Sequence, residues 1–143
     1  MIPLTLVQLV VGLTIIGQPC PAYQLHFSCF VQPTTIYLTP EDNSVETLMH
    51  EEGHADDFTN QTPTTRRKFK IIMGYKPTRR WWDVKYSMNL FKHSDSEAPG
   101  EAYAENFMGC ALDKPWKLKK LCKLLPPSNY AIWRLQTNLP KHK

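Results

Sequence analysis

The chain has 143 residues, of which 42% are hydrophobic and 21% are charged. This length and composition fit one globular domain and exclude both a multidomain protein and a disordered chain. The net charge of +4 is unevenly distributed, because residues 1–60 carry a balance of −7 and residues 61–143 a balance of +11. An acidic half is therefore followed by a basic half.

Residues 4–16 (LTLVQLVVGLTII) form an apolar run in a segment that lacks Lys and Arg. The run is too short for a membrane-spanning helix but has the length of a signal-peptide core, and small residues follow at positions 20–22. A signal peptide over residues 1–22 would leave a domain of residues 23–143 and make the protein secreted or membrane-associated. The alternative is a buried strand or helix of the domain itself, in a cytoplasmic protein.

The number of cysteines is also relevant to whether a signal peptide is removed. The sequence contains four cysteines: Cys20, Cys29, Cys110 and Cys122. They can form two disulfides only if the chain is not cut after Ala22, because cleavage would leave three. No CxxC pair is present, which argues against a zinc ribbon or a thioredoxin-like redox site. Four ordinary buried thiols are the alternative to disulfides.

Two β-prone runs come next, residues 23–30 (YQLHFSCF) and Thr34–Thr39 (TTIYLT), and they predict a pair of strands. Turn-forming residues then lead to Ser44, a good helix N-cap, with Glu46 in the first turn, where the helix dipole favours an acid. A helix from Ser44 to Phe58 is expected.

This predicted helix carries His50-Glu51-Glu52-Gly53-His54, the HExxH pattern. At about 100° per residue both imidazoles lie on one face and can bind one ion, while Glu51 can address a water on that ion. The opposite side is apolar, except for Glu52, and consists of Val45, Leu48, Met49, Ala55 and Phe58. The alternative is an exposed polar helix face.

Two histidines leave zinc short of its usual third protein ligand, so a second acidic helix is expected. After Pro99-Gly100, residues 101–112 place apolar side chains at helical spacing, and these are Ala104, Phe107, Met108 and Ala111. Glu101 and Glu105 lie one turn apart on this helix. We expect Glu101 to bind the metal and Glu105 to hydrogen-bond a ligating histidine, although the reverse assignment stays open.

Three other acids are weaker candidates. Asp57 follows the histidines on the ligand side and could orient an imidazole through its second nitrogen, with Asp56 less favoured. Glu97, which precedes Pro99, is a third option for the metal. A solvated acidic edge is the alternative for the whole acidic helix.

The residues from His50 to Phe58, followed by Glu101-Ala-Tyr-Ala-Glu105-Asn-Phe107, resemble the gluzincin metallopeptidases, and more closely the catalytic domain of anthrax lethal factor. The resemblance covers residues 34–112. It implies an α+β, zincin-like (minimal gluzincin) domain with a small sheet, an active-site helix and a glutamate helix. It also implies a single zinc ion on His50, His54 and Glu101, with Glu51 as catalytic base, and a peptide or protein substrate along Thr34–Thr39 as the sheet-edge strand.

The sequence departs from the family at two places. Glu52 replaces an apolar residue, and the family's transition-state-stabilising tyrosine has no clean match, because the position seven before Glu101 is Ser94. His93 and Tyr86 are the nearby candidates for an oxyanion donor.

The basic half contains Arg66-Arg67-Lys68-Phe69-Lys70 and Arg79-Arg80-Trp81-Trp82. Such clusters attract nucleic acid, and residues 114–123 (KPWKLKKLCK) could lie on an anionic membrane. A solvated basic face over a tryptophan-containing wall, with an amphipathic helix covering the core, is the favoured interpretation. Gly-rich phosphate loops are absent, so no nucleotide is expected.

The expected function is therefore zinc-dependent hydrolysis of peptide bonds, with a zinc-activated water and Glu51 as general base. Two alternatives remain. One is a catalytically weak or inactive zinc-binding module that captures a peptide. The other is a basic nucleic-acid-associated protein in which the HExxH pattern is incidental.

Overall fold

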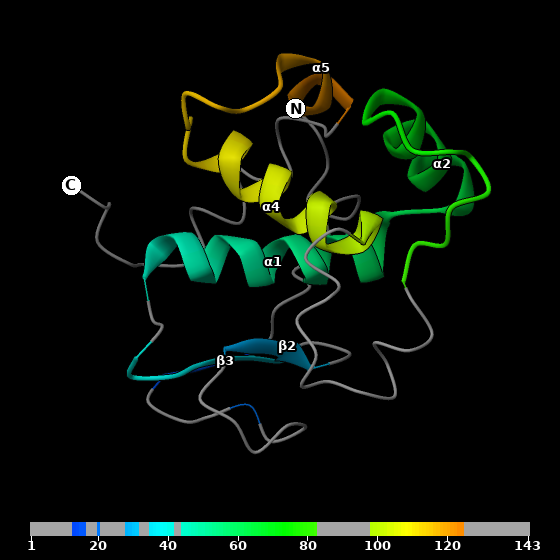
Figure 1. Cartoon of the computed structure of the whole chain (residues 1–143). Coiled ribbons are helices and arrows are strands. Elements are labelled where there is room, and N and C mark those ends of the chain that lie inside the picture. Colours follow the sequence, from blue (N-terminus) through cyan, green and yellow to red (C-terminus); the bar gives the residue numbers. More distant parts are fainter. Residues whose placement is uncertain are drawn as a thin grey trace, which may run out of the picture.

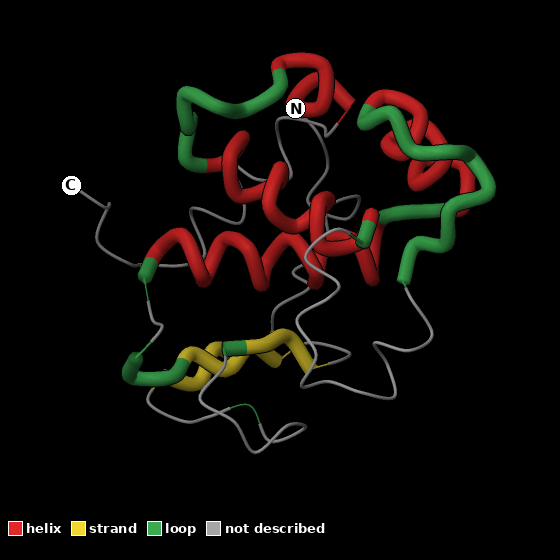
Figure 2. Tube along the Cα trace, in the orientation of Figure 1, coloured by secondary structure: helices red, strands yellow, loops and turns green. Residues whose placement is uncertain are grey.

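The computed structural model describes residues 13–16, 20, 28–31, 35–41, 44–82 and 98–124. The predicted α+β class is confirmed: a small sheet lies on one side of α1, and the other helices lie on its other side (Figures 1 and 2). The elements are β1 (Leu13–Ile16), β2 (Cys29–Val31), β3 (Thr35–Leu38), α1 (Val45–Asn60), α2 (Pro63–Ile72), α4 (Pro99–Ala111) and α5 (Lys119–Leu124).

The described sheet has the order β1-β3-β2. The expected strand pair is present, because β2 pairs antiparallel with β3, with Phe30 opposite Ile36. The other side of β3 pairs in parallel with β1, with Thr14 opposite Ile36. The prediction that Thr34–Thr39 is an edge strand is therefore wrong. The apolar N-terminal run supplies a third strand, and this strand converts β3 into the centre of the sheet.

Helix α1 matches the expected helix in position and cap. Ser44 accepts a hydrogen bond from the backbone N–H of Thr47 at 3.1 Å, which satisfies a donor that the first turn cannot pair internally. Leu48, Met49 and Ala55 are buried as expected. Phe58 differs from the expectation: it is 44% exposed, and its ring lies beside that of Phe30.

Helix α4 begins at Pro99, two residues earlier than expected. Proline is favoured in the first turn of a helix, where its missing N–H is not needed, so Pro99-Gly100 starts the helix instead of interrupting it. All four residues of the predicted apolar face are buried: Ala104, Phe107, Met108 and Ala111.

Helix α2 was not predicted. Its start carries a capping box, in which Thr62 accepts from the backbone N–H of Thr65 while Thr65 accepts from that of Thr62, followed by Pro63 in the first turn. These residues were a readable start signal. The many bases of the segment are typical of a charged, solvated linker, and they obscure this signal.

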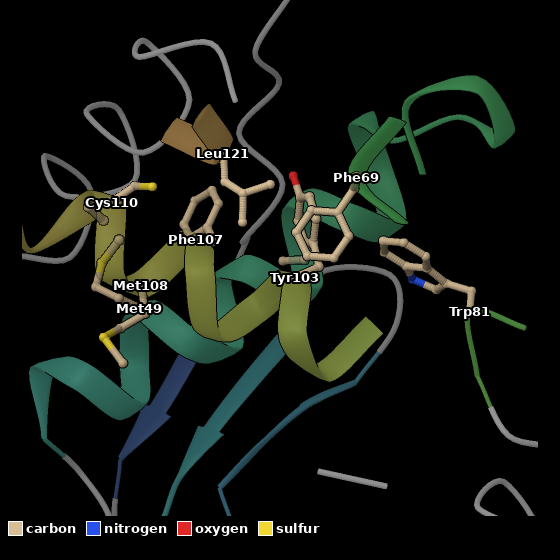
Figure 3. Close-up of a cluster of buried hydrophobic side chains, with 10 residues drawn as sticks. Met49, Phe69, Trp81, Tyr103, Phe107, Met108, Cys110 and Leu121 are labelled. Carbon is tan, nitrogen blue, oxygen red and sulfur yellow. The ribbon is translucent and has the colours of Figure 1, made fainter. Parts of the chain in front are cut away.

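The core lies between α1, α2, α4 and α5 (Figure 3). Phe69 of α2, Trp81 and Tyr103 of α4 form a cluster of rings with centroids 5.3–5.8 Å apart. Leu121 of α5 is fully buried in the same core. Phe69 and Trp81, from the two basic clusters, therefore act as packing anchors, in agreement with the favoured interpretation.

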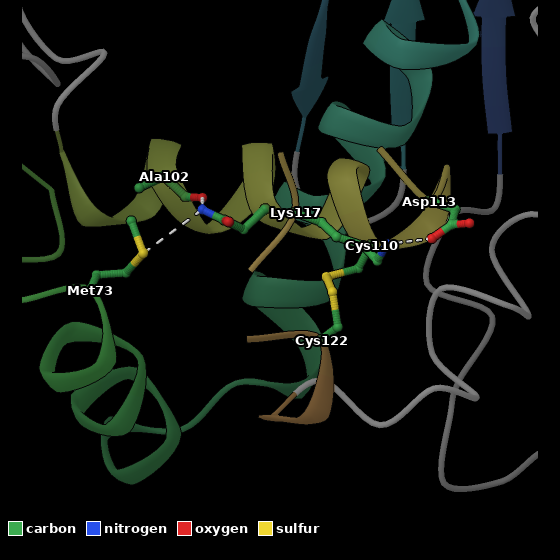
Figure 4. The surroundings of a disulfide bond; sticks show 7 residues. Met73, Ala102, Cys110, Asp113, Lys117 and Cys122 are labelled. Carbon is green, nitrogen blue, oxygen red and sulfur yellow. Dashed lines mark hydrogen bonds and ion pairs between the residues drawn. A yellow bond between two sulfur atoms is a disulfide. The ribbon is translucent and has the colours of Figure 1, made fainter. Parts of the chain in front are cut away.

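All four cysteines are disulfide-bonded. One bond joins Cys20 to Cys29 at the start of β2. The other joins Cys110 of α4 to Cys122 of α5 (Figure 4). β1 and Cys20 are therefore part of the described fold, and the strand agrees with the alternative interpretation of this segment. Processing at residue 22 remains a prediction.

Candidate metal centre

The candidate site lies where α1 and α4 cross. The two helices approach closely at Gly53, which has no side chain. A Cβ atom on this residue would lie only 2.8 Å from the Cα and 3.0 Å from the carbonyl oxygen of Ala104. Any larger side chain would push the helices apart. Gly53 stands between the two histidines of the motif, and Ala104 lies one turn from Glu101. The close crossing therefore brings Glu101 to the histidines.

Three side chains converge at this crossing. The Nε2 atoms of His50 and His54 are 3.2 Å apart. The Glu101 carboxylate lies 3.1 Å from His50 Nε2 through one oxygen and 3.0 Å from His54 Nε2 through the other. All three side chains are partly buried, with 13–22% of their surface exposed. The three ligands expected from the sequence are thus brought together.

These separations fit a zinc ion. Zinc takes nitrogen and carboxylate ligands at about 2.0–2.2 Å in tetrahedral sites, which places neighbouring donor atoms roughly 3.3 Å apart. The observed separations of 3.0–3.2 Å are close to that value. Ligand atoms of His50, Glu51 and His54 also lie within 4.8 Å of one another, a group that could hold a metal ion.

Glu105 makes the contact expected for it. Its carboxylate lies 2.9 Å from Nδ1 of His50, on the side of the ring opposite the convergence point. A carboxylate only accepts, so Nδ1 donates to Glu105, and the neutral His50 ring would bind an ion through Nε2. The geometry favours Glu101 over Glu105 as the ligand, because Glu101 reaches both Nε2 atoms.

Contacts within the cluster shift the pKa values of His50 and Glu101 in opposite directions. Burial lowers the pKa of His50, but hydrogen bonds to Glu101 and Glu105 outweigh burial and raise it to about 10. Burial raises the pKa of Glu101, yet its hydrogen bonds to the two histidines hold it well below the usual value. The cluster therefore concentrates negative charge around two imidazoles, which is the electrostatic environment of a cation site.

Glu51 lies beside this cluster and is 8% exposed. Burial raises the pKa of its carboxyl, although both histidines and a backbone hydrogen bond from Phe30 of β2 act in the opposite direction. A raised pKa makes a carboxylate a stronger base near neutral pH. The contact with Phe30 also places β2 next to the site.

Asp57 has partners other than those expected. Its carboxylate accepts from Arg66 Nε at 2.9 Å, Arg66 Nη2 at 3.0 Å and Trp81 Nε1 at 2.8 Å. Among the described residues no hydrogen bond joins it to an imidazole, so it ties α1 to α2 and to the segment after α2. Burial raises its pKa, and Arg66 opposes that effect.

Asp56, the less favoured candidate, is also part of the scaffold. It is fully buried and accepts a hydrogen bond from the Tyr103 hydroxyl at 2.6 Å. Burial and the neighbouring Asp56 carboxylate raise the pKa of Tyr103 well above its usual value. This bond is a second link between α1 and α4, on the opposite side of the crossing from the solvent.

Trp82 is a neighbour of the site that sequence reasoning did not identify. Its ring centroid lies 5.6 Å from that of His54, and its indole covers Gly100 so closely that a Cβ there would approach within 2.5 Å. The sequence signal was Gly100, whose lack of a side chain admits the indole. His93, Tyr86 and Glu97 lie outside the described residues.

Comparisons with known proteins returned no match: no family model, curated protein or solved structure is similar to this chain. Within the described ranges, no helix has both the length and the apolar character needed to cross a membrane.

Proposed function

We propose that this chain is a zinc-dependent endopeptidase with a zincin-like fold. The observation that supports this most is the convergence of His50, His54 and Glu101 within 3.2 Å of one another, with the buried Glu51 carboxyl beside them. An HExxH helix crossed by a glutamate helix is the arrangement expected of a gluzincin. The two disulfides support a secreted protein, because such bonds persist in oxidising compartments.

Each residue has a distinct role in this proposal. His50, His54 and Glu101 would hold the ion, which when bound supplies Lewis acidity toward a water and a scissile carbonyl. Glu105 holds the His50 ring so that Nε2 faces the ligand position. Glu51 takes a proton from the attacking water and passes it to the leaving amine, a role suited to a carboxylate of raised pKa.

The substrate peptide is proposed to pair with β2. Thr34–Thr39 cannot offer a free edge along β3, which is paired on both sides. β2 forms an edge of the described sheet, and its Phe30 backbone reaches the Glu51 carboxyl. A peptide added to this edge would pass the candidate base.

Zinc stoichiometry of the purified protein and of Glu101→Ala is the first test. We expect one zinc ion per chain in the wild type and a loss of affinity of at least tenfold in the variant, as one of three ligands is removed. Asp113→Asn, which alters an exposed acid just after the C-terminal end of α4, is the control and should retain the ion. A wild type that folds without zinc would contradict the proposed metal centre.

Cleavage of a peptide library by wild type and Glu51→Gln is the second test. The amide cannot accept the water's proton, so we expect turnover to fall by at least a hundredfold while zinc content is unchanged. Wild-type levels of cleavage in Glu51→Gln would contradict the proposed base. Zinc and peptide binding without hydrolysis in the wild type would instead identify the capture module.

A further inference from the structure

A second surface of the molecule is basic and takes no part in the proposed metal centre. α2 and α5 pack against each other on the far side of α1 and α4 from the sheet (Figure 1). Residues 61–82 contain seven Lys or Arg and no acid, and residues 114–124 contain five Lys and no acid. Cationic side chains therefore dominate both helices and the segments beside them.

The exposed side of α2 combines cations with isoleucines. Arg67 and Lys68 are exposed, and one turn later Ile71 and Ile72 are 55% and 38% exposed. These four positions share one helix face, whereas Phe69 is buried on the other. Exposed apolar side chains flanked by cations can enter the headgroup region of an anionic bilayer while the cations contact its acidic lipids.

The exposed side of α5, which packs against α2, is also cationic. Lys119, Lys120 and Lys123 are exposed while Leu121 is buried in the core. Leu118, immediately before the helix, is 45% exposed. We call the exposed side chains of α2 (Arg67, Lys68, Ile71 and Ile72) and of α5 (Lys119, Lys120 and Lys123) the α2–α5 surface.

Among the described residues, no ion pair joins a cation of this surface to an acid. In the described part of the chain, ion pairs formed by lysine or arginine use Arg66, Lys114 and Lys117. None of these belongs to the α2–α5 surface. Its cations are therefore available to an anionic partner.

We propose that the α2–α5 surface binds an anionic lipid bilayer. The lysines would contact acidic headgroups, and Ile71 and Ile72 would enter the boundary between headgroups and acyl chains. A nucleic acid would satisfy the cations equally well but offers no apolar phase for the two isoleucines. The metal centre lies at the α1–α4 crossing, so binding through α2 and α5 does not require its residues.

Vesicle sedimentation of the full chain tests this proposal. We expect binding to vesicles of phosphatidylcholine with phosphatidylserine, weakened by added salt, and at least tenfold weaker binding to phosphatidylcholine alone. Equal binding to the two vesicles, or binding to neither, would overturn the proposal.

Two sets of variants locate the contact. Lys119→Gln/Lys120→Gln/Lys123→Gln should lower partition by about a hundredfold, at about fivefold per lysine, whereas the matched arginine variant at the same positions should bind as the wild type does. Ile71→Ser/Ile72→Ser should weaken binding at least tenfold. Thermal unfolding and zinc content, measured in parallel, should be unchanged in each.

An oligonucleotide is the comparison ligand. If the isoleucine variant binds vesicles like the wild type and single-stranded RNA binds more tightly than the acidic vesicles, the surface is a nucleic-acid site and the lipid proposal fails. None of these outcomes depends on peptidase activity.

Discussion

Neighbouring glutamates on α1 have different surroundings. Glu51 lies with the two imidazoles, whereas Glu52 points into the core, is 2% exposed, and has one carboxyl oxygen without a partner among the described residues. Burial raises the pKa of Glu52 to about 9. Glu52 falls on the apolar side of the helix, where the pattern calls for a hydrophobe, and the structure buries it there. The carboxyl is consequently neutral at physiological pH.

Glu52→Gln should make the protein more stable at neutral pH. The carboxyl ionises near pH 4.5 in the unfolded chain but near pH 9 in the folded one, so the folded state holds an extra proton between these values and wild-type stability falls as the pH rises. A glutamine has no proton to lose. We expect an advantage of up to about 4 kcal/mol at pH 7.5, measured by chemical denaturation.

A comparison of the wild type and Glu52→Gln at low pH is the control for this prediction. Below pH 4.5 the carboxyl is neutral in both states, so the advantage of Glu52→Gln should disappear there. A difference that is constant from pH 4 to pH 8 would show that ionisation of Glu52 is not its cause.

At the scale of elements, the contact between α1 and α4 determines the site. Gly53 lets the helices approach, and the hydrogen bond from Tyr103 to Asp56 joins them. Each ligand stands on a helix that the core also holds, through Met49 on α1 and Phe107 on α4. Rigid, packed helices are the usual way in which proteins hold metal ligands in place.

Gly53→Ala should therefore weaken both folding and metal binding. The new methyl meets the backbone of Ala104 at 2.8 Å, and backbone atoms cannot move aside without shifting the helix. We expect a loss of about 1–3 kcal/mol in the free energy of unfolding and a measurable drop in zinc affinity as Glu101 moves away from the histidines.

Gly109→Ala is the matched control for this prediction. Its methyl would meet the ring of Trp116 at 2.7 Å, but that side chain is 47% exposed and can rotate away. Its zinc affinity should equal that of the wild type. If both alanine variants bind zinc normally, the close helix crossing is not what positions Glu101.

For the whole molecule, stability depends on cross-links as well as on the core. α5 has six residues, too few to be stable alone, and it is held by Leu121 and by the Cys110–Cys122 bond (Figure 4). This bond spans 12 residues and ties α5 to the glutamate helix.

Cys110→Ala/Cys122→Ala should lower the free energy of unfolding by about 3 kcal/mol, because the unfolded chain regains the freedom that the closed loop removes. Urea denaturation under oxidising conditions measures this loss. An unchanged midpoint would indicate that packing of Leu121 alone holds α5.

The sequence by itself determined the local features of this protein. The positions of α1 and α4, the Ser44 cap and the shared face of His50 and His54 follow from helical periodicity and capping, which act over a few residues. The expected hydrogen bond between Glu105 and a histidine is present, and Glu101, one turn earlier on the same helix, lies against both imidazoles. Metal binding by Glu101 stays a prediction.

Only the tertiary structure decided the long-range features. The central position of β3 depends on pairing with β1, which lies some 20 residues away and leaves no local trace. The partners of Asp57 are Arg66 on α2 and Trp81 in the segment after α2, and neither contact follows from the pattern of α1 alone. Strand pairing and contacts between elements depend on how the elements pack together. The sequence of a single element does not specify this packing.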